Sequence, residues 1–128
     1  MRAFDKFVIS GASLAVLALL PGCLAGAVAA GAVTAAYVGG DLEAHLEGSP
    51  KRIVEASEAA LEDMEVRVVS SDASGVDGKV VGRTALDKKV EITVGRETDT
   101  TSKISIRIDT FGDEKLSRQI LDKIRAKL

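Results

Sequence analysis

The sequence predicts an α+β domain in which two helices cover one face of a five-stranded, mainly antiparallel sheet, in the order β-α-β-β-β-β-α. Three observations lead to this fold class. Five short stretches place apolar residues at every second position or are rich in β-branched residues, as half-buried strands are. Two longer stretches carry apolar residues at helical spacing. Strands and helices do not alternate regularly along the chain, which argues against a parallel, doubly wound sheet.

The first strand and the first helix are predicted to follow each other directly. Residues 41–47, read as DLEAHLE, alternate apolar with polar side chains, so one side of this strand is expected to be buried. Ser49 is expected to cap the helix, since its hydroxyl can accept a first-turn N–H, and Pro50 suits the first helical position. Within residues 50–64 the apolar stripe consists of Ile53, Ala56, Ala60, Leu61 and Met64.

The middle of the domain is predicted to contain three strands. Residues 65–70 are β-branched and are expected to form a strand, whereas residues 71–78 are rich in turn formers. Strands are then expected at residues 79–86 and 89–94, joined by a tight turn at residues 87–88.

A polar loop at residues 95–102 leads to the last strand and the last helix. Residues 103–109, read as KISIRID, alternate without a break. Thr110 and Asp113 resemble a capping box at the start of a helix, and both are expected to cap it. The apolar stripe of that helix consists of Leu116, Ile120, Leu121, Ile124 and Leu128.

The sheet is predicted to have one face free of helices. If both helices lie on one face, the other face shows mostly charged side chains. These are Glu43, His45, Glu47, Arg83, Lys89, Glu91, Lys103 and Arg107. This face and the edge of the hairpin at residues 76–95 are the two candidate contact surfaces.

The N-terminal residues resemble a lipoprotein export signal. Arg2 and Lys6 precede the uncharged stretch 7–20, which has the length of a signal-peptide core and is shorter than the roughly 20 residues of a membrane-spanning helix. Residues 20–23, Leu-Pro-Gly-Cys, resemble a bacterial lipobox. The resemblance implies cleavage after residue 22, a diacylglycerol (a palmitate-type anchor) on Cys23, and acylation of the new amine.

Residues 23–40 are expected to connect this anchor to the globular domain. Residues 24–40 are rich in alanine and glycine and lack charge. Two interpretations stay open, a tether and a membrane-associated or self-pairing helix with small residues at every fourth position. Leu24, in place of an aspartate after the cysteine, implies sorting to the outer membrane of a Gram-negative bacterium by resemblance to known lipoproteins. The periplasmic domain is then expected to comprise residues 41–128.

A wider resemblance covers the chain from Tyr37 onward. The most specific segment is residues 106–108, Ile-Arg-Ile, followed by Phe-Gly-Asp at residues 111–113, with Ser117 and Ile120 beyond. These residues resemble a family of small bacterial lipoproteins catalogued as a domain of unknown function. Asp109 departs from the family pattern, which usually has glycine at that position. The resemblance implies no activity, cofactor or catalytic residue.

Composition and motifs argue against several function classes. The net charge is −2 and the chain has three Phe, one Tyr and no Trp, so no nucleic-acid partner is expected. His45 is the single histidine, with Glu43 and Glu47 beside it, and it is expected to be a solvated strand residue rather than a metal ligand. The last helix start could bind an anion, but its own acidic residues favour a capping role.

The sequence therefore predicts a non-enzymatic, membrane-anchored contact or scaffold module of the bacterial envelope. Its partner is expected to be an envelope protein or polymer, or a second copy of the chain. The alternative is the binding of a small apolar ligand or lipid between the sheet and the helices. No catalytic residue, metal or cofactor is predicted.

Overall fold

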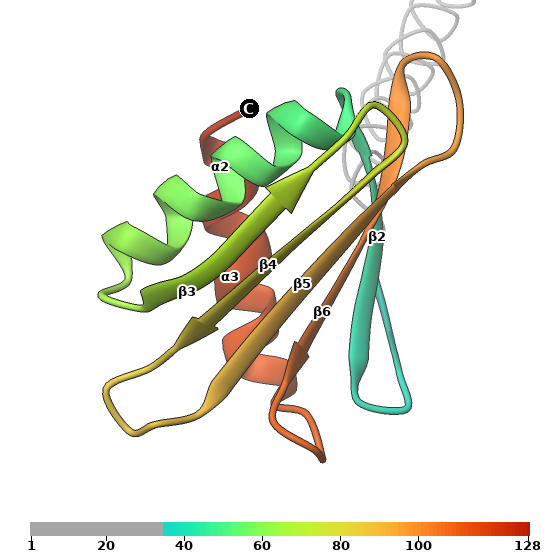
Figure 1. Cartoon of the computed structure of the whole chain (residues 1–128). Coiled ribbons are helices and arrows are strands. Elements are labelled where there is room, and N and C mark those ends of the chain that lie inside the picture. Colours follow the sequence, from blue (N-terminus) through green and yellow to red (C-terminus); the bar gives the residue numbers. More distant parts are fainter. Residues whose placement is uncertain (1–34) are drawn as a thin grey trace, which may run out of the picture. The chain divides into compact units, whose positions relative to one another are not determined.

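The computed structural model describes residues 35–128 and confirms an α+β fold, with a sheet of six antiparallel strands and two helices (Figure 1). The elements in chain order are β1 (Ala35–Val38), β2 (Asp41–Glu47), α2 (Pro50–Asp63), β3 (Arg67–Ala73), β4 (Asp77–Arg83), β5 (Lys89–Arg96), β6 (Thr101–Ile108) and α3 (Glu114–Ala126). The predicted signal peptide, the lipidation site Cys23 and residues 24–34 of the predicted tether lie outside the described residues.

The strands lie in the order β1-β2-β6-β5-β4-β3, and every neighbouring pair is antiparallel. Both helices pack on the same face of this sheet (Figure 1). Helix α2 contacts β3, β4 and β5, whereas α3 contacts β2 and β6 and also packs against α2. This arrangement agrees with the apolar stripes of the sequence, because the stripe of each helix packs against the apolar side of the strands.

The core consists of alternate strand residues that meet the apolar stripes of the helices. Leu42, Ile106, Ile92 and Val80 pair in register across four strands, and all four are 0 % exposed. The stripes of α2 and α3 meet them with residues that are also fully buried: Ile53, Ala60, Leu61, Ile120 and Ile124. Burial of each large aliphatic side chain contributes about 1.5–3 kcal/mol. The interface between sheet and helices is therefore filled with side chains.

The prediction of five strands is wrong by one, because the expected tether contains a strand. Ala35 and Tyr37 of β1 lie opposite Ala44 and Leu42, on the core side of the sheet, and both are partly buried against the core. A two-glycine turn, Gly39-Gly40, with φ of +59° and +94°, reverses the chain into β2. Two of the four residues of β1 are alanines, which have low β-propensity, so the strand conformation depends on pairing with β2.

Two further expectations are corrected around the central hairpin. The strand expected at residues 79–86 ends at Arg83, and Leu86 lies in the turn with 82 % of its surface exposed. The expected contact edge at residues 76–95 is wrong, because β4 and β5 both pair on two sides. The sheet edges are β1 and β3, and β3 extends to Ala73 into a segment that was expected to be a loop.

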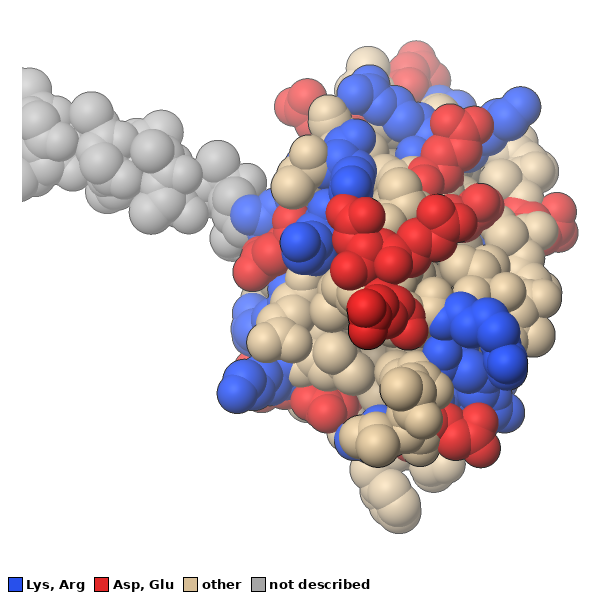
Figure 2. Space-filling view, turned by 90° about the vertical axis from the view of Figure 1, so that its left-hand side faces the viewer, with Lys and Arg blue, Asp and Glu red and all other residues tan. Residues whose placement is uncertain are grey.

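The outer side of α2 is acidic. Glu55, Glu58 and Glu62 follow one another at intervals of three and four residues, which places them on the same side of the helix. Figure 2 shows acidic side chains gathered on the side of the molecule that carries α2 and β3.

Candidate functional site

The face of the sheet opposite the helices is the larger of the candidate contact surfaces. Its side chains are the polar partners of the alternating strands, and each of the eight residues expected there is exposed or partly exposed. They form ion pairs within the sheet: Lys103 Nζ lies 3.3 Å from Glu43, and the Nζ atoms of Lys89 and Lys79 lie 3.4 and 3.5 Å from Glu91. Because these pairs are solvated, each contributes at most about 1 kcal/mol to stability.

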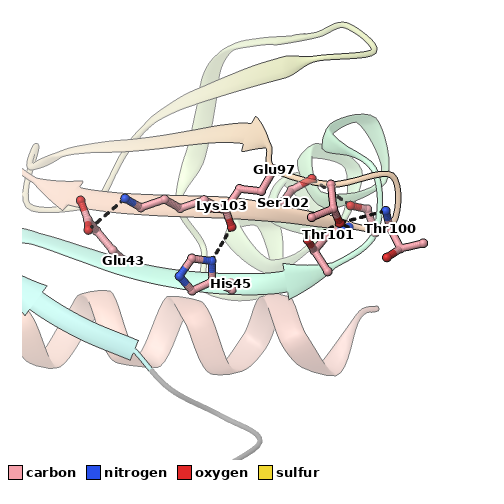
Figure 3. Close-up of polar contacts among 9 residues, drawn as sticks. Glu43, His45, Glu97, Thr100, Thr101, Ser102 and Lys103 are labelled. Atoms are coloured by element: carbon pink, nitrogen blue, oxygen red, sulfur yellow. Dashed lines mark hydrogen bonds and ion pairs between the residues drawn. The ribbon is translucent and has the colours of Figure 1, made fainter.

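His45 lies near the C-terminal end of β2 on this face and contacts a loop. Its Nδ1 atom is hydrogen-bonded to Glu97 in the β5–β6 loop, and its cross-strand neighbour is Lys103 (Figure 3). The side chain of His45 is 63 % exposed. Among residues 35–128, no group of three His, Cys, Asp or Glu side chains is placed to hold a metal ion. The structure thus places His45 as a solvated strand residue that links β2 to a loop.

The same loop is connected to the start of α2. The N–H of Gly48 donates to the carbonyl of Thr100 at 2.8 Å, and the buried Ser102 hydroxyl donates back to the carbonyl of Gly48 at 2.9 Å. Ser49 occupies the N-cap position of α2, and its hydroxyl accepts the N–H of Arg52 at 3.3 Å. The β2–α2 connection and the β5–β6 loop therefore form one hydrogen-bonded unit.

Arg107 organises the opposite end of the open face. Its Nη1 donates to the carbonyl of Gly39 at 3.1 Å and to Asp41 Oδ1 at 3.0 Å, and its Nη2 donates to the carbonyl of Thr110. One guanidinium thereby joins the β1–β2 turn to the β6–α3 loop. Beside it lies an open depression of about 380 Å³, lined by Arg83, Lys89, Glu91, Arg107, Asp109 and Thr110.

Each cation that lines this depression already has an acidic partner. Lys89 pairs with Glu91, Arg83 lies 3.8 Å from Asp87, and the donors of Arg107 are engaged as described. Asp109 accepts the N–H of Lys89 at 2.8 Å. An anionic ligand would have to displace these carboxylates, so the depression offers no ready anion site.

The start of α3 is capped by Asp113 alone. The Asp113 carboxylate accepts the N–H of Leu116 at 3.0 Å, which is the hydrogen bond of an N-cap residue. The capping role expected of Thr110 is therefore corrected: Thr110 lies in the loop, and its carbonyl accepts from Arg107. Because the carboxylate of Asp113 accepts the N–H of Leu116 and places a negative charge at the helix start, it disfavours an external anion there.

A shallow groove separates the end of α2 from the start of α3 and the β4–β5 turn. Its volume is about 410 Å³. The apolar part of its lining includes Met64, Val66, Leu86 and Leu116. Phe111, in the β6–α3 loop, is 90 % exposed. Exposed apolar side chains at loop tips are compatible with a contact role.

One titratable group has a clearly shifted pKa. Lys127, hydrogen-bonded to Asp63, holds the pKa of that carboxyl below its ordinary value, and Lys123 adds a smaller effect in the same direction. This pair joins the last turn of α2 to the end of α3. The pair links the two helices, and neither of its residues lines either depression.

Sequence reasoning missed Glu97 and the role of Arg107. Glu97 lies 52 positions after His45 in a loop, and no local pattern indicates that the two side chains meet. Arg107 was placed on the open face by alternation, but its contacts with two loops follow from the pairing of β1 with β2, which was not predicted. Within residues 35–128 no helix is long and apolar enough to cross a membrane.

Comparison with protein families gives one match. The model of a family described as "Protein of unknown function (DUF3568)" matches residues 6–127. No curated protein matches the chain.

Proposed function

The chain belongs to DUF3568, a family of unknown function as the sequence predicted, and we propose that it is a lipid-anchored, non-enzymatic contact module of the bacterial envelope. One observation carries the contact role. Among residues 35–128, helices cover one face of the sheet only, and the opposite face carries an array of solvated ion pairs that join β2 to β6 and β5 to β4. Such an array can exchange its internal partners for those of another surface at small cost.

The anchor in this proposal is Cys23. The lipobox resemblance of residues 20–23 gives the cysteine a diacylglycerol and a free amine for a further chain. Two or three acyl chains hold a protein stably on a bilayer, whereas one gives only marginal binding. With Leu24 after the cysteine, the anchored domain faces the periplasm from the outer membrane.

The packing of the domain favours a contact role over the alternative of an apolar ligand between sheet and helices. The side chains that would line such a cavity, among them Leu42, Ile92 and Ile106, are 0 % exposed. A ligand cavity needs lining atoms that a solvent molecule can touch. The proposal accordingly assigns no catalytic residue, metal or cofactor.

Labelling and crosslinking of the full chain in its native envelope test the proposal. Labelled palmitate should mark the wild type and not a Cys23→Ser variant, because only the cysteine offers a thiol. Label on the variant, or an unmodified thiol at Cys23 in the wild type, would refute the anchor.

The contact role is tested by reversing charges on the open face. A Glu43→Lys and Lys103→Glu exchange keeps the pair and reverses its polarity, whereas Glu114→Lys with Arg118→Glu makes the same exchange on α3. Crosslinks formed by the wild type should weaken in the first variant and persist in the second. Crosslinks that are equal in both variants would contradict a contact role for the open face.

A further inference from the structure

We propose that the outer edge of β3 accepts an extended basic segment of a partner protein as an additional strand. The inference deepens the contact role proposed above and rests on it, but it does not depend on the lipid anchor. It adds the location of one contact and the chemistry of the partner.

Strand β3 is the longer of the two sheet edges. It pairs with β4 on one side, and no strand of the described part of the chain pairs with its other side (Figure 1). A β-bulge between Val68 and Ser70 shifts the register, after which Ser70 to Ala73 pair with β4 without interruption. A bulge hinders strand addition locally, so the straight segment 70–73 is where an added strand would pair.

Each face of this segment has a carboxylate beside it. Ser71 donates a hydrogen bond to Glu58 of α2, so the helix side of the segment lies next to the acidic side of α2. Asp72, the next residue, points to the open face of the sheet, since successive strand residues alternate. Its cross-strand neighbour there is Lys79, whose Nζ lies 3.5 Å from Glu91. No ion pair of Glu55, Glu58, Glu62 or Asp72 is found within the described residues, so these carboxylates keep their charge available to a partner.

This arrangement specifies the partner's side chains. In an added strand, the residue opposite Ser71 lies on the helix side beside Glu58, and its neighbour opposite Asp72 lies on the open face. Two consecutive Lys or Arg residues in an extended conformation would therefore each meet a carboxylate. The backbone hydrogen bonds give affinity, and the two cations give selectivity.

Charge excludes two other occupants. The segment 70–73 has no basic residue, so a second copy paired through this segment would supply no cation there and would bring the two acidic helices together. The chain's own segment 7–40 has no charged residue at all. The geometry and charge thus fit a separate, basic partner.

Peptide binding to the full chain, measured by fluorescence anisotropy, tests the inference. The probe is a short threonine- and valine-rich peptide with Lys-Arg at its centre. Two matched peptides serve as comparisons: one has Ser-Ser at the centre, and the other keeps Lys-Arg but carries methyl groups on alternate backbone nitrogens. The probe should bind, and it should slow amide hydrogen exchange at residues 70–73. Both comparison peptides should bind much more weakly, since one lacks the charges and the other lacks the N–H donors.

Variants of the chain locate the charges. Glu58→Gln with Asp72→Asn should weaken probe binding by about 2- to 5-fold per carboxylate, as expected for solvated ion pairs. Glu114→Gln with Asp122→Asn removes the same charge from α3 and should leave binding unchanged; thermal melts check that both variants fold. Absence of binding, equal binding of either comparison peptide, or equal weakening in both variants would overturn the inference. Such a failure leaves the crosslinks of the open face unaffected, so it is distinguishable from failure of the proposed contact role.

Discussion

Asp109 shows how a single residue can hold a backbone conformation that favours glycine. It has a φ of +53°, in the left-handed region. Its backbone N–H donates to the carbonyl of Lys89 at 2.8 Å, and its carboxylate accepts the N–H of Lys89 at 2.8 Å. Aspartate tolerates this region better than most residues, and here the side chain adds a hydrogen bond that glycine lacks. The left-handed turn at this position is therefore formed without glycine.

Substitutions at Asp109 should separate these two effects. Asp109→Gly loses the hydrogen bond but relieves the strain, so we expect a stability within about 0.5 kcal/mol of the wild type. Asp109→Ala loses the bond and keeps the strain, so it should cost about 1–2 kcal/mol. Urea unfolding of the two variants measures the difference, and an alanine variant as stable as the glycine variant would contradict this account.

Replacement of two buried serines by alanine should change stability in opposite directions. The hydroxyl of Ser117 in α3 has no hydrogen-bond partner among residues 35–128, whereas that of Ser102 donates to Gly48. Ser117→Ala should raise stability by about 0.5–1 kcal/mol, because alanine removes an unpaired buried hydroxyl and favours the helix. Ser102→Ala should lower stability by about 1 kcal/mol. Denaturant midpoints of the two variants that move in the same direction would refute the contrast.

At the scale of elements, the β1–β2 turn and the β6–α3 loop behave as one unit. Gly112 has a φ of +84°, and a Cβ atom there would clash with the hydroxyl of Tyr37 and lie 2.6 Å from the carbonyl oxygen of Gly40. With the hydrogen bonds of Arg107, this close approach fixes β1 onto the rest of the sheet. The short strand therefore depends on a loop that is distant in sequence.

Gly112→Ala should consequently destabilise the domain by at least about 2 kcal/mol, from left-handed strain and the clash with backbone. The loss should be accompanied by faster amide exchange in β1. Gly75→Ala is the matched control, since a Cβ atom there meets no atom within 4 Å, and its effect should stay within about 0.5 kcal/mol. If amide exchange in β1 were unchanged in the Gly112→Ala variant, the stability of β1 would not depend on the β6–α3 loop.

The two helices are joined at their ends by Asp63 and Lys127, and this link should depend on pH. Since the folded state lowers the pKa of Asp63, its contribution to stability is fully present above the ordinary aspartate pKa of about 3.9 and is lost as the pH falls through the lowered value. When the pH is lowered from neutral to about 3, the free energy of unfolding should therefore fall less in the Asp63→Asn variant than in the wild type.

Denaturant midpoints at the two pH values measure this difference. Asp122→Asn is the control, because the Asp122 carboxylate is 75 % exposed and 3.9 Å from Arg125. An Asp63→Asn variant with the same acid sensitivity as the wild type would show that the link does not contribute.

At the scale of the whole molecule, the sequence was informative where one face of an element is buried. The alternation in β2 and β6 and the stripes of α2 and α3 follow directly from burial, so these elements were predictable. Strand β1 was not, because Ala35 to Val38 carry little periodic signal and gain their conformation from pairing with β2. The order of strands, and with it the identity of the edges, depends on contacts between distant segments that no local pattern records.

The candidate site divides in the same way. Alternation placed the charged residues of the open face, because the pattern that buries one side of a strand exposes the other. The contact of His45 with Glu97 and the acidic surroundings of the β3 edge required the strand order. A surface assembled from several elements is therefore visible only in the folded chain.

The filled core gives a prediction that distinguishes the proposed contact role from the alternative, the binding of an apolar ligand. If no cavity lies between sheet and helices, a fatty acid such as myristate should leave the thermal midpoint of the full chain unchanged, since only a ligand bound by the native state raises it. Ile106→Ala should cost about 2–5 kcal/mol, because the tightly packed surroundings cannot close around the missing atoms. Val38→Ala, at a side chain that is 63 % exposed, should change stability by less than about 0.5 kcal/mol. A saturable rise of the wild-type midpoint with myristate would instead favour ligand binding, and the open face would lose its claim to be the functional surface.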